Sequence, residues 1–289
     1  MITQLIPIAL AYIMFTLGLG LKFRDFLYIQ QHPGVFLIGL FNQLILVPIV
    51  FLLAVWLLDP APAIAFGLML ISFCPGGVTS NLFTRMANAN VALSIALTGV
   101  VSLLSVLTLP ILTTAAYQFF FQNTIATVSI AGLGIKLFIL TTIPVIIGMT
   151  LRHFIPAVVE RSQRLIANSA TLIFVLILIA TIIVQHQTLI RVFSDIGMVL
   201  PVISAVLLIV SMLTTRLLHL PAADTITIAI ESSVQNGSVG MAVATLIAVE
   251  QVLPEYALPS LLYGLLMNII VIPFVILVGR RQHQVHSVV

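Results

Sequence analysis

Charged residues are scarce in this chain of 289 residues, where Asp, Glu, Lys and Arg together make up only 7%. Soluble domains carry about 25% of these residues. Hydrophobic residues make up 61% of the chain, and the mean hydropathy is +1.26. A water-soluble core cannot hide this much apolar sequence, so lipid must be the solvent for most of the chain. The composition therefore predicts one compact domain embedded in a membrane.

Cysteine is nearly absent, and histidine is absent from the long apolar runs. Cys74 is the one cysteine, which excludes an intramolecular disulfide and a cysteine metal cluster. The six histidines all lie between apolar runs, which argues against a histidine-ligated metal or a histidine proton relay within the membrane. We find no phosphate-cradling loop, nucleophile elbow or enzyme-like pair of acids, so we expect neither an enzyme nor an organic cofactor.

Nine runs are long and apolar enough to span a bilayer, which takes about 20 residues. They are 4–20, 34–58, 63–88, 91–118, 130–151, 165–185, 196–215, 222–249 and 257–279. The first run lacks a basic leader and a small-residue cleavage site, so we interpret it as a retained span rather than a signal peptide. The predicted fold class is an all-α polytopic membrane protein with about nine transmembrane helices.

The distribution of basic residues predicts an orientation. The formal net charge is +3, and nine of the eleven Lys and Arg residues fall in one set of loops. They stand singly, which is typical of topology signals rather than of a nucleic-acid-binding surface. The positive-inside rule then places the tail, 280–289, in the cytoplasm and the N-terminus outside the inner membrane.

Two of the runs contain polar and helix-breaking residues near their middle. The third reads LISFCPGGVTSNLFTRM and the eighth reads ITIAIESSVQNGSVGMAVATL. They lie five runs apart and so cross the membrane in opposite directions, which is the pattern of an inverted repeat with two broken helices. Two five-helix repeats need ten helices, so the first repeat is expected to lack its opening helix.

Glu231 lies inside the eighth run, where a charged group costs about 2.5–3.5 kcal/mol even on the lenient insertion scale. Such a residue needs a partner or a function. One interpretation is a structural ion pair with Lys136, near the start of the fifth run. The other, which we favour, is a cation ligand or proton carrier. It is favoured because the oxygen-bearing Ser232, Gln235 and Asn236 follow directly, and hard cations take oxygen ligands.

A second polar cluster follows Pro75 in the third run. Proline interrupts the helical hydrogen-bond ladder, so Thr79, Ser80 and Asn81 are expected to begin a half-helix. The exposed N–H groups and the positive dipole end of that half-helix suit an anionic ligand.

Four further polar residues inside runs are ambiguous. Ser94 and Thr98 are four residues apart and share one helix face. Taken alone, interhelical packing explains this pair more readily than ligand binding does. Gln43 in the second run and Asn268 in the ninth leave the same two alternatives open.

These interrupted segments resemble the signatures of the bile acid:sodium symporter family. FCPGGVTSNLFTRMANANVALSIALT is similar to the family's first crossover helix and ESSVQNGSVGMAVATL to its second, while MFTLGLGLKFRDF and FNQLILVPIV also fit. The resemblance covers nearly the whole chain and identifies it as a nine-span member of bacterial type. It implies a panel domain, 1–33 and 130–195, and a core domain, 34–129 and 196–279.

The resemblance also implies two sodium sites behind the crossing of the broken helices. The first is expected to contain Ser80, Asn81, Ser94, Thr98 and Glu231. The second is expected to contain Gln43, Glu231 and Gln235 with the backbone carbonyls of Ser232 and Val234. Expected substrate contacts are Thr79, Asn236 and Asn268. The family often has threonine where Val78 stands and glycine where Ser233 stands, and the change at Val78 favours an organic acid smaller than a bile acid.

Together these observations predict a sodium-coupled symporter of organic anions that works by alternating access, with sodium as the coupling ion and no other cofactor. One alternative is a proton-coupled carrier or sodium/proton antiporter in which Glu231 carries the proton. A remote alternative is an intramembrane enzyme acting on lipids. One buried carboxylate without a histidine in any span offers too few groups for acid–base catalysis.

Overall fold

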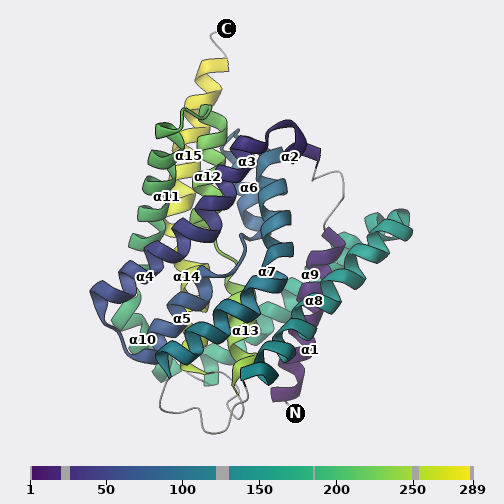
Figure 1. Ribbon diagram of the computed structural model, residues 1–289, viewed down its shortest axis with the longest axis vertical. Coiled ribbons are helices and arrows are strands. Elements are labelled where there is room, and N and C mark those ends of the chain that lie inside the picture. Colours follow the sequence, from purple (N-terminus) through teal and green to yellow (C-terminus); the bar gives the residue numbers. More distant parts are fainter. Residues whose placement is uncertain (1, 21–26, 122–129, 185, 249–253, 287–289) are drawn as a thin grey trace.

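The computed structural model describes residues 2–20, 27–121, 130–184, 186–248 and 254–286, and these are almost entirely helical (Figure 1). The α-helices are α1 (Ile2–Gly20), α2 (Leu27–Gln31), α3 (Pro33–Phe41), α4 (Val47–Leu58), α5 (Pro62–Ser72), α6 (Val78–Met86), α7 (Val91–Phe120), α8 (Ile130–Phe154), α9 (Pro156–Val184), α10 (His186–Ile196), α11 (Val199–Leu217), α12 (Ala222–Ser233), α13 (Gly237–Ile247), α14 (Leu258–Leu266) and α15 (Asn268–His286). A π-helical turn, η2 (Asn42–Leu46), joins α3 to α4, and a 3-10 turn, η3 (Glu255–Ala257), precedes α14. An all-helical structure follows from the apolar composition, because a chain in lipid must satisfy its backbone polar groups internally.

Four stretches of the described residues are long and apolar enough to cross a membrane. They are Pro33–Leu58, Val91–Phe120, Val199–Leu217 and Glu255–Arg280. A fifth candidate is the pair Phe138–Phe154 and Pro156–Gln163, which is bent by 116°. Shorter apolar helices occur at Ala11–Gly20, Pro62–Ser72 and Gly237–Ile247. The chain is therefore a multi-pass membrane protein, and the count of nine spans stays a prediction.

Both predicted interruptions are present. Helix α5 ends at Ser72 and α6 begins at Val78, while α12 ends at Ser233 and α13 begins at Gly237. The two interruptions lie against each other: Gly76 and Gln235 form an isolated antiparallel bridge, and the Asn236 N–H donates to the Pro75 carbonyl at 3.0 Å. Helices α5 and α13 occupy the lower half of Figure 1 and α6 and α12 the upper half, so the broken helices cross at their breaks.

Helix packing around this crossing is close. Helix α12 packs against α11, α7 and α6, and α13 packs against α14, α1 and α5. Glycine at position 237 allows α13 to pack closely on α14. A Cβ on Gly237 would collide with the Ser260 carbonyl and stand 3.1 Å from the Cα of Gly264. Helix α1 packs mainly against α8 and α9, which come later in the chain.

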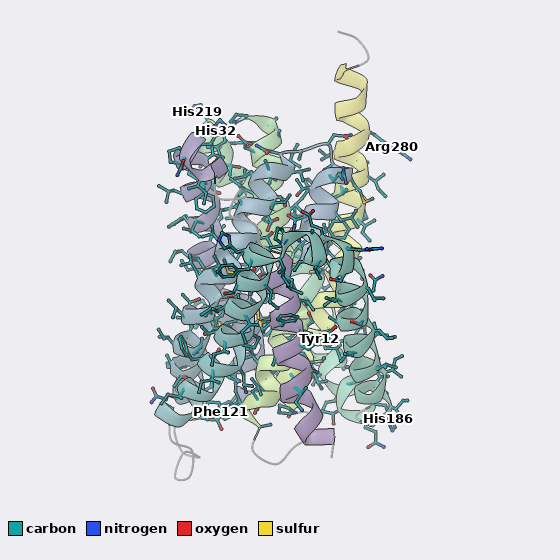
Figure 2. All side chains as sticks on the ribbon, turned by 90° about the vertical axis from the view of Figure 1, so that its right-hand side faces the viewer. Tyr12, His32, Phe121, His186, His219 and Arg280 are labelled. Carbon is teal, nitrogen blue, oxygen red and sulfur yellow. The ribbon has the colours of Figure 1, made fainter. Side chains whose placement is uncertain are left out.

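The outer surface is apolar and the polar residues gather at the ends. Trp56 is 75% exposed and Leu165 74%, as expected for side chains that face lipid. Figure 2 shows His32, His219 and Arg280 at one end of the molecule and Phe121 and His186 at the other. The N- and C-terminal ends also lie at opposite ends of the long axis (Figure 1).

One boundary prediction was wrong. The sixth run was predicted to begin at residue 165, with Arg161 in a loop, but α9 begins at Pro156 and includes Arg161. The first turns of α9 contain charged residues, so they do not belong to an apolar run. They are tied to α8 by Arg152, which donates to Gln163 at 2.8 Å and to Glu160 at 3.2 Å.

Candidate cation-binding site

The carboxylate of Glu231 is buried at the crossing and is surrounded by hydroxyl groups. Its Oε1 atom accepts a hydrogen bond from Ser80 Oγ at 2.7 Å and a second from Ser94 Oγ. The Thr98 hydroxyl lies 3.1 Å from Oε1 and 3.0 Å from Oε2. Ser94 Oγ also lies 2.8 Å from the Oδ1 atom of Asn81. All five residues predicted for the first site are thus brought together.

Three helix segments position these groups. Ser94 and Thr98 lie one turn apart on the same face of α7, as their four-residue spacing predicted. Both contact Glu231 on α12. Ser80 lies in the first turn of α6, where its hydroxyl also contacts the Gly77 carbonyl at 2.6 Å. Gly76 passes directly over the carboxylate, where a Cβ would stand only 2.7 Å from Glu231 Oε2. The break in the third run therefore brings α6 within reach of Glu231.

The negative charge of Glu231 has no basic neighbour among the side chains that the structure describes. Its hydrogen-bond partners are Ser80, Ser94 and Thr98, and its side chain is 4% exposed. The alternative partner Lys136 falls outside the described side chains. A carboxylate that is buried without a basic partner is costly to ionise, and a bound cation offsets that cost.

A second group of oxygen atoms lies beside the first. Gln43 Nε2 donates to Gln235 Oε1 at 2.9 Å, and Gln235 Nε2 donates to the Ser232 carbonyl at 2.9 Å. Gln43 Nε2 also lies 3.4 Å from the carbonyl of Cys74. The Oε1 atom of Gln43 is buried with no hydrogen-bond partner among the described residues. Such an atom costs about 1–3 kcal/mol unless something binds it.

The oxygen atoms around Glu231 and Gln43 indicate which kind of cation could bind there. The ligands offered are one carboxylate, hydroxyls, amide oxygens and backbone carbonyls, which suit a hard cation. Within the described residues, no group of three His, Cys, Asp or Glu side chains could hold a metal. A single carboxylate lacks the charge that binds a divalent ion tightly, so the arrangement fits monovalent cations best.

The three expected substrate contacts are less closely grouped. Thr79 is exposed in the first turn of α6, and Asn236 is half-buried at the N-terminus of α13, where its Oδ1 accepts from the Val239 N–H at 3.2 Å. Asn268 Nδ2 bonds to its own chain, at the carbonyls of Gly264 (2.9 Å) and Leu265 (3.0 Å). No contact among Thr79, Asn236 and Asn268 is present in the described part of the chain.

Sequence reasoning missed two polar residues that support the site. Asp224, 7% exposed, accepts from Asn90 Nδ2 at 2.7 Å and lies two turns before Glu231 on α12. Tyr263, fully buried on α14, donates to the Ser233 carbonyl at 2.9 Å and so fixes the last turn of α12. Asp224 had a detectable signal, since it falls inside the eighth run, whereas Tyr263 had none.

Two interrupted helices that cross at a buried, oxygen-lined carboxylate define the class of secondary membrane carriers. Residues 7–192 match the family described as the Sodium Bile acid symporter family. The chain belongs to that family, which consists of transporters and not of enzymes. The match ends before Glu231, so it covers the stretch from Gln43 to Thr98 but not Glu231 itself.

Individual relatives extend the similarity across the second half. A sodium-dependent transporter of Bacillus subtilis, described as uncharacterized, is 30% identical over 93% of this chain and 81% of its own length. A probable chloroplastic sodium/metabolite cotransporter of Oryza sativa is 32% identical over 55% of this chain and 37% of its own length. The human ileal sodium/bile acid cotransporter is 26% identical over 81% of this chain and 67% of its own length.

Proposed function

We propose that this protein is a sodium-coupled symporter of organic anions. The observation that carries the proposal is the Glu231 carboxylate, which is buried among the hydroxyls of Ser80, Ser94 and Thr98 where two broken helices cross. The relatives described as sodium-dependent support the same ion.

Two sodium ions fit the arrangement, one at each oxygen group. The first site takes its ligands from Ser80, Asn81, Ser94, Thr98 and Glu231. The second takes them from Gln43, Glu231, Gln235, Ser232 and Val234. The unpartnered Gln43 Oε1 atom favours the second site, because a cation there would satisfy a buried acceptor.

The charges at the crossing favour an anionic substrate. Two sodium ions and one Glu231 carboxylate leave a net charge of +1, which one carboxylate substrate neutralises. The N-terminal ends of α6 and α13 meet at the crossing and present their N–H groups and positive dipole ends. Thr79 and Asn236 lie at these ends and are the proposed contacts, with Asn268 beyond them on α15.

Transport proceeds in this proposal by movement of the core, 34–129 and 196–279, against the panel, 1–33 and 130–195. Sodium binding orders the two interruptions and sets the half-helix ends to receive the anion. The protein lies in the cytoplasmic membrane with its N-terminus outside and its C-terminus inside. Two sodium ions per monovalent anion carry one net charge, so the membrane potential assists uptake by about 2.3 kcal/mol per 100 mV.

The first experiment measures thermal stability of the purified protein in sodium and in potassium. A ligand that binds the folded state stabilises it by about 2.7 kcal/mol at one hundred times its dissociation constant. We expect sodium to raise the melting temperature of the wild type and of Asp59→Asn, an exposed acid that directly follows the last residue of α4. We expect no sodium-specific rise in Glu231→Ala, and a smaller one in Gln43→Ala.

Equal effects of sodium and potassium on all four proteins refute sodium binding. Uptake into proteoliposomes then tests the proton alternative, in which a pH gradient replaces sodium and Glu231 carries the proton. With sodium binding established, indifference of uptake to membrane potential refutes the two-to-one stoichiometry.

A further inference from the structure

The helix that carries Gln43 contains a π-helical turn. Between α3 and α4 the turn η2, Asn42–Leu46, closes with a hydrogen bond from the Val47 N–H to the Asn42 carbonyl, five residues back. A π-turn holds one residue more than an α-helical turn and is a rare feature that occurs frequently at functional sites. Gln43, a residue of the proposed second sodium site, lies inside this turn.

Two consecutive side chains of the turn face different neighbours. Residues that follow one another in a helix point about 100° apart. Gln43 reaches the interruption between α12 and α13, where it donates to Gln235 Oε1 at 2.9 Å. Asn42 instead reaches α11, where its Oδ1 accepts from the Thr214 hydroxyl at 3.1 Å. Any rotation of the turn therefore moves both contacts together.

Asn42 is fully buried and both ends of its amide are used. Its Nδ2 donates to the carbonyl of Ile38 at 2.8 Å, one turn earlier in α3. Thr214 shares its hydroxyl between Asn42 and the carbonyl of Ser211 at 3.0 Å. The link to Thr214 thus anchors the start of the π-turn to a helix that has no residue in either sodium site.

The two flanks of the turn are held independently. Gly39 packs closely on Leu97 of α7, where a Cβ would stand 2.6 Å from a methyl group, and Val47 is fully buried at the start of α4. The number of residues between these flanks is fixed, so a change of the π-turn to an α-turn would rotate Gln43 by about one residue step, or about 100°. The side-chain amide of Gln43 would then leave its contact with Gln235 at the crossing.

We propose that Asn42 and Thr214 are positioning residues for the second sodium site. Their hydrogen bond keeps the π-turn in the register that presents Gln43 Oε1 to the ion, and it couples α11 to occupation of that site. The inference rests on the proposed function, since it deepens the account of one of its two sites. By reciprocity of binding, sodium in the second site also strengthens the contact between η2 and α11.

The test compares neighbouring threonines on α11. Thr214→Val removes the donor to Asn42 with little change of shape. Thr215→Val is the matched control, because Thr215 is fully buried and its hydroxyl bonds only to its own helix, at Ser211 O (2.7 Å) and Met212 O (3.1 Å). Thr214→Ser restores the donor, and Thr214→Ala replaces the valine variant if that protein does not fold.

The readout is the sodium dependence of thermal stabilisation, taken relative to each variant's own melting temperature in potassium. A loss of stability that has nothing to do with sodium cancels in this difference. We expect Thr214→Val to raise the half-saturating sodium concentration about fivefold, which corresponds to about 1 kcal/mol, and to lower the Hill slope towards one. Thr215→Val and Thr214→Ser should stay within about twofold of the wild type.

The outcomes separate this inference from the function on which it rests. If Thr214→Val matches Thr215→Val while Gln43→Ala still weakens sodium binding, the positioning role is refuted and the second site stands. If Gln43→Ala and Glu231→Ala both respond to sodium as the wild type does, the sodium sites themselves are refuted. A failure of Thr214→Ser to restore binding also overturns the inference, because it removes the hydroxyl as the cause.

Discussion

Alanine at Gly76 should move the Glu231 carboxylate, because the new Cβ crowds that group but stands at an ordinary contact distance, 3.7 Å, from its hydroxyl partner Ser80. Gly76 has a negative φ angle, so alanine adds no backbone strain there. The new Cβ would stand 2.7 Å from Glu231 Oε2, whereas ordinary van der Waals contact begins at 3.4 Å. The carboxylate must therefore retreat by about 0.7 Å, since the end of a side chain gives way more easily than the bridged backbone of Gly76.

The expected loss of sodium affinity follows from the contact between Thr98 and Glu231 Oε2. A retreat of this size along the bond from Thr98 lengthens its 3.0 Å distance to about 3.7 Å, which is no longer a hydrogen bond. A hydrogen bond to a charged group contributes about 1.5–3 kcal/mol. We expect the same displacement to weaken the contact between the carboxylate and a bound sodium ion by a similar amount, which at 1.4 kcal/mol per tenfold change is about 10- to 100-fold in affinity.

The assay is the half-saturating sodium concentration, from stabilisation of the purified protein or from uptake into proteoliposomes. Gly77→Ala is the matched control. Its Cβ would stand 3.1 Å from the Thr79 hydroxyl, whose side chain is exposed, and 3.8 Å from the Thr79 backbone nitrogen. Half-saturation in Gly76→Ala within twofold of Gly77→Ala would show that the position of the carboxylate does not set sodium affinity.

Three further substitutions distinguish support of the fold from binding. Tyr263→Phe leaves the Ser233 carbonyl without its 2.9 Å donor and should lower stability by about 1 kcal/mol in chemical or thermal unfolding. Asp224→Ala removes the 2.7 Å bond to Asn90 and should also destabilise. Asp224→Ala should keep the half-saturating sodium concentration within twofold of the wild type, because Asp224 lies seven residues, or about 10 Å, along α12 from Glu231. A larger change would place Asp224 in the site. Arg191→Ala breaks an exposed ion pair of 2.7 Å and should change stability by less than about 1 kcal/mol, so a larger loss would contradict the exposed geometry.

The broken helices could be predicted because their causes are local. Proline at position 75 removes a helical donor, and the polar stretch from Ser232 to Asn236 offers the backbone other partners. The structure ends α5 and α12 within a few residues of these signals. Most membrane-crossing stretches were also found to within a few residues, since apolar length is itself the physical requirement.

The residues that gather around Glu231 could be predicted from the sequence, whereas the residues that support them could not. Ser94 and Thr98 had a helical spacing that placed them on one face, and the resemblance gave them a partner in Glu231. The π-turn at Asn42 had no sequence signal, because its register depends on how α3 and α4 pack against other helices. Asn268 stays a predicted substrate contact, and its Nδ2 atom donates to the carbonyls of Gly264 and Leu265 in α14.

The bridge between the two interruptions also bears on how the chain is made. In hydrocarbon, backbone groups without partners cost several kcal/mol each, and the breaks at Gly76 and Gln235 satisfy one another. These residues are 159 positions apart (235 − 76). At about 5–20 residues per second, the ribosome needs about 8–30 s to supply the second break after the first.

During that interval the first break is in the membrane without its partner. The nascent chain then carries backbone groups whose partner has not yet been made, and incompletely folded chains are prone to aggregation. Slow translation between residues 76 and 235 should therefore reduce the yield of intact protein, although it changes no residue of the mature fold.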